Sequence, residues 1–309
     1  MNIQQLDYII AVDRLRHFAK AAEACGVTQP TLSMMIQKLE EELEVDIFDR
    51  KKSPIEVTPI GKKLISQAKV IKFNLKQFKE IADSARDTVD GELSIAIIPT
   101  LAPYIIPQFF GETRKRLPDL KIKISEIRTS EIIEQLKSAQ IEVAIASTPI
   151  DEPSILELPL FYERFIAYIS PLEKKMYRKD TIVASELDPA GMWLLQEGHC
   201  FRSQMLNICH KSENSMQVYE AGSIETLIRI VDSNGGYTLL PELHLSSLTA
   251  QQKENVRYFS GDEPRREISF VFREDFVKER LINELVEVVK LMIPSHMLDK
   301  RLSKFRVKL

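Results

Sequence analysis

Apolar residues recur with helical spacing in two short stretches near the N-terminus. The first stretch follows i, i+3, i+4, i+7 spacing and consists of Phe18, Ala21, Ala22 and Cys25. The second has similar spacing and consists of Leu32, Ile36, Leu39 and Leu43. Gly26 between them suits a tight turn, and Thr28 is a good N-cap for the second helix. Two helices joined by a short glycine-containing turn predict a helix-turn-helix.

The second predicted helix turns a polar face away from its apolar side. That face carries Gln29, Thr31, Ser33, Met34, Gln37 and Lys38. Small polar groups on such a helix reach base edges in the major groove of DNA. The pattern therefore indicates a DNA-binding element. Helices of an ordinary bundle show the same spacing, so spacing alone leaves that interpretation open.

A longer helical repeat begins at Thr58-Pro59, an N-cap followed by proline at the first helical position. The repeat forms an a/d seam of Leu64, Ala68, Ile71, Leu75, Phe78, Ala82 and Ala85. Such a narrow apolar stripe favours pairing with a second helix. The alternative is an amphipathic helix packed on its own domain. We expect a helix over residues 58–86 that connects the N-terminal part to the rest and pairs two chains.

Residues 87–91 (DTVDG) mark a boundary, after which short apolar runs alternate with helical patterns. The order strand, helix, strand, helix, strand predicts a parallel α/β sheet. The expected strands are 92–99, 121–127, 143–147, 158–170, 193–195, 237–240 and 268–273, and the expected helices are 103–116, 130–139, 220–232 and 281–292.

Composition narrows the class of protein. The 309 residues suffice for two or three domains, and no apolar run approaches a transmembrane length. The N-terminus lacks the basic and apolar regions of a signal peptide, and three cysteines do not make a disulfide scaffold. We therefore expect a soluble, cytoplasmic protein without a membrane partner.

Charge gives only local support to DNA binding. The net charge is −3, and residues 1–58 contain 7 Lys and Arg against 10 Asp and Glu. Any positive footprint is therefore local, and its best candidates are Arg50, Lys51, Lys52, Lys20 and Lys38. A short basic run is often a solvated turn. Because Arg50–Lys52 lies between two apolar segments, we favour phosphate contact.

Two cysteines offer redox chemistry. Cys200 follows His199 and precedes Arg202 by two residues, and nearby cationic groups favour the reactive thiolate. A thiolate attacks peroxide to give a sulfenic acid, which condenses with a second thiol, here Cys209. The spacing has no meaning of its own, however. Buried structural cysteines remain the alternative, as for Cys25, and a zinc site lacks the usual ligand pairs.

The segment between the two cysteines has a geometric consequence. If residues 200–209 are helical in the reduced protein, their ends lie about 13 Å apart at ~1.5 Å per residue. A disulfide tolerates at most ~7 Å between Cα atoms. Oxidation would then refold the segment, and a segment with two arrangements can bias a dimer interface and the spacing of the DNA-binding domains.

The N-terminal stretch resembles the LysR-type transcriptional regulators. The residues in register with their signature are His17-Phe18, Ala21-Ala22, Val27, Gln29-Pro30, Leu32-Ser33, Ile36, Leu39-Glu40, Leu43, Phe48 and Arg50. The resemblance implies an α/β protein with an N-terminal winged helix-turn-helix (residues 1–58), a long linker and dimerisation helix (59–90) and a two-lobed regulatory domain like the periplasmic binding proteins (91–309). In the latter, the chain is expected to cross between lobes near residues 162 and 268.

Within this family the chain is most similar to the peroxide-sensing members. The matching segments are Ile98-Pro99-Thr100, Pro103-Tyr104, Thr129, Gly198-His199-Cys200, Cys209, Glu225-Thr226-Leu227, Leu239-Leu240-Pro241 and Glu263-Pro264-Arg265-Arg266. The resemblance implies that Cys200 is the peroxidatic thiol and Cys209 the resolving thiol. It places Thr100, Thr129 and His199 around the peroxide, with Arg266 polarising it. The DNA-binding residues would be Gln29, Pro30, Thr31, Ser33, Lys38, Arg50 and Lys51.

Two departures bear on this interpretation. Ser203 replaces an acidic residue common in the loop, and Val218 stands where some members have histidine. These changes could shift the reactivity or the geometry of the reduced state without removing the chemistry.

The expected function is thus a hydrogen peroxide-sensing transcription regulator, an activator rather than an enzyme, without cofactor or metal. Its expected partners are double-stranded operator DNA, further copies of itself in a dimer of dimers, RNA polymerase, and a thiol reductant such as glutaredoxin or thioredoxin. One alternative is a LysR-type regulator of a small organic effector bound between the lobes, with structural cysteines. Another is a thiol peroxidase, which the helix-turn-helix disfavours.

Overall fold

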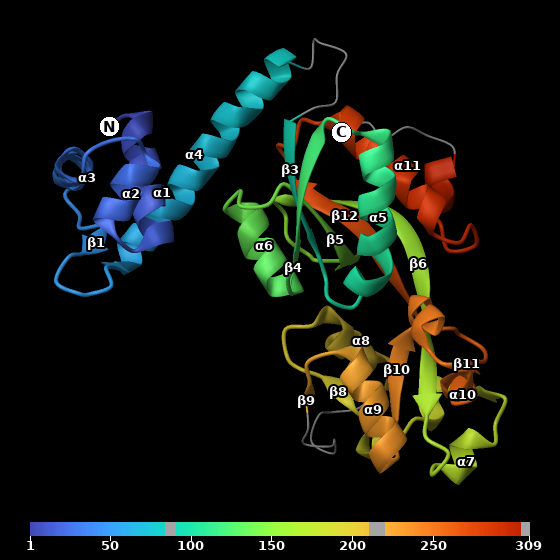
Figure 1. Cartoon of the computed structure of the whole chain (residues 1–309). Coiled ribbons are helices and arrows are strands. Elements are labelled where there is room, and N and C mark those ends of the chain that lie inside the picture. Colours follow the sequence, from blue (N-terminus) through green and yellow to red (C-terminus); the bar gives the residue numbers. More distant parts are fainter. Residues whose placement is uncertain (84–90, 210–219, 304–309) are drawn as a thin grey trace. The chain divides into compact units, whose positions relative to one another are not determined.

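The computed structural model describes residues 1–83, 91–209 and 220–303 (Figure 1). Contacts divide the chain into two compact units, one built mainly from residues 1–88 and the other mainly from residues 89–309. Across the described residues, no helix combines the length and apolar character needed to cross a bilayer.

The first unit begins with three helices and a short hairpin. They are α1 (Ile3–Leu15), α2 (Phe18–Ala24), α3 (Gln29–Leu43), β1 (Phe48–Asp49) and β2 (Glu56–Val57), with β1 and β2 antiparallel. Thr28 caps α3 by accepting a hydrogen bond from the backbone N–H of Thr31. The helix-turn-helix and its wing are therefore confirmed, whereas α1 was not predicted. Its Leu6, Ile9 and Val12 are buried in the same core as α2 and α3.

The apolar stripes of α2 and α3 form that core with one exception. Leu32, Ile36 and Leu39 have no exposed surface, but Leu43 is 37 % exposed. Leu43 is the last residue of α3, and Glu44 ends the helix in the left-handed conformation. The expectation that Leu43 belongs to the buried stripe was wrong because the helix stops there.

The first unit ends in the long helix α4 (Pro59–Asp83), which confirms the predicted helix over its described length. Ile65 and Ala68 pack into the core of the unit, and Lys69 and Lys72 form ion pairs with Asp13 and Asp7 of α1. Further along the helix, Phe78 is 75 % exposed. The side chains of Ala82 and Ala85, expected in the a/d seam, lie outside the described residues.

The second unit contains two lobes. Lobe 1 has the strand order β4-β3-β5-β12-β6, in which β3 (Gly91–Ile97) is parallel to both β4 (Leu120–Glu126) and β5 (Val143–Thr148). The predicted parallel arrangement of the first three strands is thus confirmed. The sheet becomes mixed beyond them, because β12 (Arg265–Arg273) runs antiparallel to β5. The helices of lobe 1 are α5 (Ala102–Arg116), α6 (Thr129–Lys137) and α11 (Glu279–Met292).

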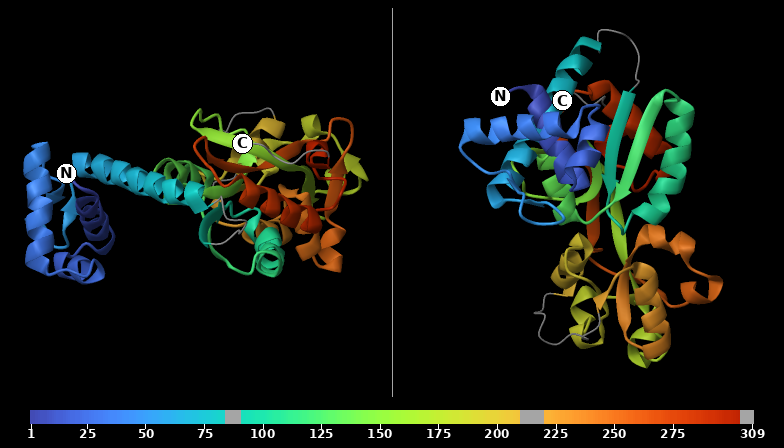
Figure 2. Two further views of the ribbon diagram at one scale, coloured as in Figure 1. Left: turned by 90° about the horizontal axis from the view of Figure 1, so that it is seen from above. Right: turned by 60° about the vertical axis from the view of Figure 1, so that its left-hand side comes forward.

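The long strand β6 (Ile155–Ile169) belongs to both lobes (Figures 1 and 2). Its first part pairs with β12, and its last part pairs with β10 (Tyr237–Pro241) and β11 (Val256–Phe259) of lobe 2. Phe161 belongs to the hydrophobic core of lobe 1, and Phe165 belongs to the core of lobe 2. The chain returns to the core of lobe 1 between Phe259 and Ile268. The two expected crossings, near residues 162 and 268, agree with these positions.

Lobe 2 is built from shorter elements. Its helices are α7 (Lys174–Tyr177), α8 (Cys200–Cys209), α9 (Ile224–Asn234) and α10 (Ala250–Lys253), and its remaining strands are β7 (Thr181–Ile182), β8 (Leu194–Leu195) and β9 (Glu220–Ala221). The start of the predicted helix 220–232 was wrong, because β9 pairs with β8 and Ser223 then caps α9. Short 3-10 helices cover Ala184–Glu186, Pro189–Gly191, Glu242–Ser247 and Lys300–Ser303.

Candidate functional site

A small pocket lies between the two lobes of the second unit. It is lined by Ile98, Pro99, Thr100, Arg128, Thr129, His199 and Cys200. The space between these atoms is about 160 Å³ and holds no sphere the size of a water molecule. The structure therefore brings Thr100, Thr129, His199 and Cys200 together, as predicted, although their distance along the chain is large.

Two helices begin at this pocket. Thr129 is the first residue of α6, and Cys200 is the first residue of α8. The N-terminal N–H groups of a helix carry partial positive charge and attract negative charge. The hydroxyl oxygen of Thr129 is buried and has no hydrogen-bond partner among the described residues. A small polar ligand in this pocket would therefore meet an unused hydroxyl and two helix ends.

His199 supplies an imidazole to the pocket. Its side chain is buried. Burial, and next the positive charge of Arg128, lower the pKa of His199 below its ordinary value. The imidazole is consequently neutral at neutral pH, with one nitrogen donating and the other accepting.

Arg266 lies behind the pocket rather than in its wall. Its guanidinium donates to the Thr100 hydroxyl at 2.8 Å and to the Thr100 carbonyl at 3.3 Å. It forms an ion pair with Glu163 at 2.7 Å, and it also lies over the Phe201 ring, 5.1 Å from its centroid. Arg266 thus reaches the pocket through Thr100, and its expected role in polarising a ligand stays a prediction.

Cys200 stands where the two lobes meet. Its half-buried thiol is free and packs against the core of lobe 1, whereas the next residue, Phe201, is fully buried in the core of lobe 2. The helix α8 extends from Cys200 to Cys209. At ~1.5 Å per residue its ends are about 13 Å apart, twice what a disulfide tolerates. The expected helical arrangement is present. The side chain of Cys209 and residue Val218 lie outside the described residues.

Several polar contacts hold the start of α8 to lobe 1. The amide of Gln204 donates to the hydroxyl of Ser147 on β5 at 2.7 Å. Arg128 donates to the side chain of Gln196 at 2.9 Å and to the carbonyl of Glu197 at 3.2 Å. Rotation of α8 away from lobe 1 would break these contacts. Ser203, one of the departures, is on this helix and is exposed.

Sequence reasoning missed Arg128 and Glu163. Arg128 follows a predicted strand as a single charged residue, which gave no signal in the sequence. Glu163 is a charged residue within a mostly apolar strand, and this was a usable signal for a buried ion pair. In the described part of the chain, no group of three or more His, Cys, Asp and Glu side chains is arranged to hold a metal ion.

Cys25 has different surroundings from Cys200. It caps the end of α2 and packs partly buried against the core of the first unit. Burial, and next the nearby carboxylate of Asp7, raise the pKa of the Cys25 thiol. A thiol held in this state is a poor nucleophile, which fits the structural part expected for it.

The predicted DNA-binding residues lie on the surface of the first unit. Gln29, Pro30, Thr31 and Lys38 of α3 are exposed and Ser33 is half-buried, while Arg50 and Lys51 follow β1 and are exposed. A groove of the same unit is lined by Arg16, His17, Phe18, Ala19, Gln29, Ser53, Pro54 and Ile55. This groove connects the start of α3, which is expected to contact bases, with the wing, which is expected to contact phosphates. No bound nucleic acid tests these roles, and they stay predictions.

Comparison with known families agrees with this division. Residues 3–62 match the family described as "Bacterial regulatory helix-turn-helix protein, lysR family". Residues 86–292 match the family described as "LysR substrate binding domain". The two matched regions correspond to the helix-turn-helix unit with the start of α4 and to the two lobes.

Individual relatives within this family are also similar to the chain. A "Hydrogen peroxide-inducible genes activator" of Haemophilus influenzae is 33 % identical over 278 residues, covering 88 % of this chain and 91 % of the relative. The "DNA-binding transcriptional dual regulator OxyR" of Escherichia coli K12 is 31 % identical over 299 residues, covering 96 % of this chain and 97 % of the relative. The solved structure of a full-length OxyR variant from Pseudomonas aeruginosa superposes with a TM-score of 0.82 at 30 % identity. The match covers 97 % of this chain and 98 % of the solved one.

Proposed function

The chain belongs to the LysR family of bacterial transcription regulators, and we propose that it is a hydrogen peroxide-sensing regulator switched by a reversible Cys200–Cys209 disulfide. One observation carries the proposal. The Cys200 thiol lies in a small pocket with His199, Thr100 and Thr129 at one end of α8, and Cys209 is the last residue of the same helix. The names of the relatives support the choice of peroxide as the signal.

The first step is an attack of sulfur on peroxide. The Cys200 thiolate takes one oxygen, the O–O bond breaks, and the sulfur becomes a sulfenic acid while hydroxide leaves. The neutral imidazole of His199 and the hydroxyls of Thr100 and Thr129 would hold the peroxide by hydrogen bonds. The N–H groups at the starts of α6 and α8 would stabilise negative charge on the leaving oxygen, which takes up a proton to become water.

The second step forms the disulfide. The Cys209 thiol attacks the sulfenic sulfur, an S–S bond forms and water leaves. Because the helix holds the two residues about 13 Å apart, α8 must unwind for this step. Unwinding would withdraw Cys200 from lobe 1 and Gln204 from Ser147. An external dithiol such as glutaredoxin or thioredoxin would reduce the disulfide by exchange and restore the helix.

The readout is the arrangement of the DNA-binding domains. We propose that residues 1–58 bind operator DNA, that residues 59–90 pair two chains, and that residues 91–309 sense peroxide, with two dimers forming the active assembly. Base contacts are assigned to Gln29, Thr31 and Ser33, and phosphate contacts to Arg50 and Lys51. Refolding of α8 would change the interface between regulatory domains and, through it, contact with RNA polymerase in the cytoplasm.

The size of the pocket disfavours an organic effector at this place. Sites for drug-sized ligands occupy roughly 300–1,000 Å³, whereas this pocket has no room even for a sphere the size of a water molecule. Any ligand must therefore displace lining side chains to enter, and a molecule as small as hydrogen peroxide requires the least displacement.

A direct test uses the reduced full-length protein and one equivalent of hydrogen peroxide. We expect loss of two thiols per chain, a changed footprint on DNA, and recovery of both on adding a dithiol. Retention of all thiols, with an unchanged footprint, would overturn the proposal in favour of the organic-effector alternative.

A further inference from the structure

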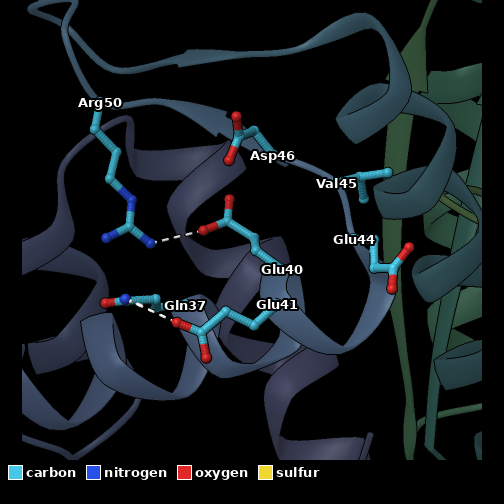
Figure 3. Close-up of a pocket in the computed structure, with 7 residues that line it drawn as sticks. All are labelled: Gln37, Glu40, Glu41, Glu44, Val45, Asp46 and Arg50. Atoms are coloured by element: carbon cyan, nitrogen blue, oxygen red, sulfur yellow. Dashed lines mark hydrogen bonds and ion pairs between the residues drawn. The ribbon is translucent and has the colours of Figure 1, made fainter.

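Glu40 and Arg50 are joined across the DNA-binding unit by an ion pair. The Arg50 guanidinium lies 2.7 Å from Oε2 of Glu40, which is on α3 (Figure 3). The other carboxylate oxygen, Oε1, accepts the backbone N–H groups of Ile47 at 2.8 Å and Phe48 at 3.1 Å. One carboxylate therefore holds both the start of the wing and its arginine.

The burial of the two partners is unequal. The side chain of Glu40 is 9 % exposed and that of Arg50 is 38 % exposed. A carboxylate this buried is held in place by its three hydrogen bonds, whereas the guanidinium keeps one side toward solvent. The Phe18 ring lies under the guanidinium, with 5.4 Å between Cζ and the ring centroid. Arg50 is consequently fixed from two directions.

This fixed guanidinium still has unused donors. Arginine has five N–H donors in a planar fork. Among the described residues, Arg50 donates a side-chain hydrogen bond to Glu40 alone. Figure 3 shows the remaining terminal nitrogen on the side away from the acidic residues. Phe18, the ring beneath Arg50, also lines the groove between α3 and the wing. Phe18 therefore connects the guanidinium of Arg50 to the surface expected to meet DNA.

We propose that Glu40 is a positioning residue for DNA binding, which orients Arg50 and the wing so that the guanidinium fork meets a backbone phosphate. The inference rests on the proposed DNA-binding function and adds a residue to it. Its consequence is counter-intuitive, because a negative charge near the DNA surface strengthens binding. If charge alone mattered, neutralising Glu40 would tighten binding to the polyanion.

The substitution Glu40→Gln distinguishes positioning of Arg50 by Glu40 from an effect of charge alone. The glutamine oxygen can still accept from Ile47 and Phe48, but its amide nitrogen is a donor and cannot accept from Arg50. Glu41→Gln is the matched control, since it removes the same charge from the next residue. Glu41 accepts from Gln37 at 3.0 Å and does not contact Arg50 (Figure 3), and a glutamine oxygen can keep that bond.

The experiment measures binding of the reduced full-length protein to a long random-sequence duplex over a series of salt concentrations. We expect Glu40→Gln to bind about tenfold more weakly, as for loss of one charge-assisted hydrogen bond. The slope of log K against log salt should fall by about 1, as in Arg50→Ala. Glu41→Gln should bind as well as the wild type or better. In the Arg50→Ala background, Glu40→Gln should cause no further loss.

Three results would overturn the inference. They are tighter binding by Glu40→Gln, equal effects of Glu40→Gln and Glu41→Gln, and an additive loss in the double variant. Should Glu40→Gln melt below the assay temperature, Glu40→Asp serves instead. It keeps the charge but shortens the side chain, so weaker binding supports positioning and unchanged binding refutes it. A wild-type protein that binds no DNA would contradict the proposed function itself, whatever the variants do.

Discussion

The guanidinium of Arg266 lies 2.7 Å from the carboxylate of Glu163 at a point where neither side chain has any exposed surface. The two residues come from β12 and β6, the strands at which the chain crosses between lobes. Burial raises the pKa of Glu163, and the charge of Arg266 partly offsets this. Because Arg266 also contacts Thr100 and the ring of Phe201, the pair connects the lobe crossing to the pocket and to α8.

Arg266→Met should destabilise the regulatory domain by about 3–5 kcal/mol, because it leaves a buried carboxylate without its partner. Urea unfolding of the reduced protein measures this. The double variant Arg266→Met with Glu163→Leu should recover much of the loss, since no unpaired charge remains. If Arg266→Met lowers the free energy of unfolding by less than about 1 kcal/mol, water reaches Glu163 and the ion pair is not buried.

Ile71 and Leu75 of α4 should hold two chains together. Both are only half-buried in the isolated chain, and Phe78 beyond them is exposed. Replacing Ile71 and Leu75 by glutamate would place unpaired charge in the seam. Light scattering should then show a smaller species, with loss of cooperative DNA binding. Lys79→Glu, on an exposed position of the same helix, is the control. An unchanged assembly in the double glutamate variant would show that the seam packs within one chain.

Arg50 and Thr31 should contact different parts of the DNA, a backbone phosphate and a base respectively. Arg50→Ala should weaken binding to all sequences alike and flatten the salt dependence by about 1 in slope, because a phosphate contact is lost. Thr31→Val should instead alter the preference between sites, by roughly 1–3 kcal/mol for a base contact. Binding to operator and random duplexes over a salt series separates the two. Identical effects of both substitutions on both duplexes would reject these roles.

His199 should make the stability of the regulatory domain depend on acidity. Burial lowers its pKa in the folded state, whereas a histidine of the unfolded chain takes up a proton near pH ~6.5. The stabilisation is therefore present above pH ~6.5 and is lost as the pH falls toward the lower pKa of the folded state. Thermal unfolding below pH ~6.5 should show a shallower fall for His199→Gln than for the wild type. The same fall in both would mean that His199 is solvated.

The sequence predicted those elements whose apolar spacing is long and regular. Thr28 and the stripe of α3 located the helix-turn-helix, and the run after Pro59 located α4. The two-residue strand β9 was missed because so short a pairing leaves no periodic signal. Leu43 was misplaced because the spacing does not reveal where the helix ends.

The site was predictable only in part, and for a physical reason. The family resemblance supplied Thr100, Thr129, His199 and Cys200, which the fold brings into one pocket. No local pattern could have paired Arg128 with Gln196, or Arg266 with Glu163, because those contacts join distant segments through the crossing of the lobes. Arg266, which the resemblance assigned to the peroxide site, contacts Thr100 of that pocket, and its role toward the peroxide stays a prediction.

The central claim is the switch, and mass spectrometry of the reduced protein after one equivalent of hydrogen peroxide tests it most directly. The comparison uses the wild type, Cys200→Ser, Cys209→Ser and Cys25→Ser. The wild type and Cys25→Ser should form the intramolecular disulfide, with altered protease sensitivity in residues 197–215. Cys209→Ser should stop at the sulfenic or higher acids, because the resolving thiol is gone, and Cys200→Ser should not react. A peroxide response that survives in Cys200→Ser would contradict the account.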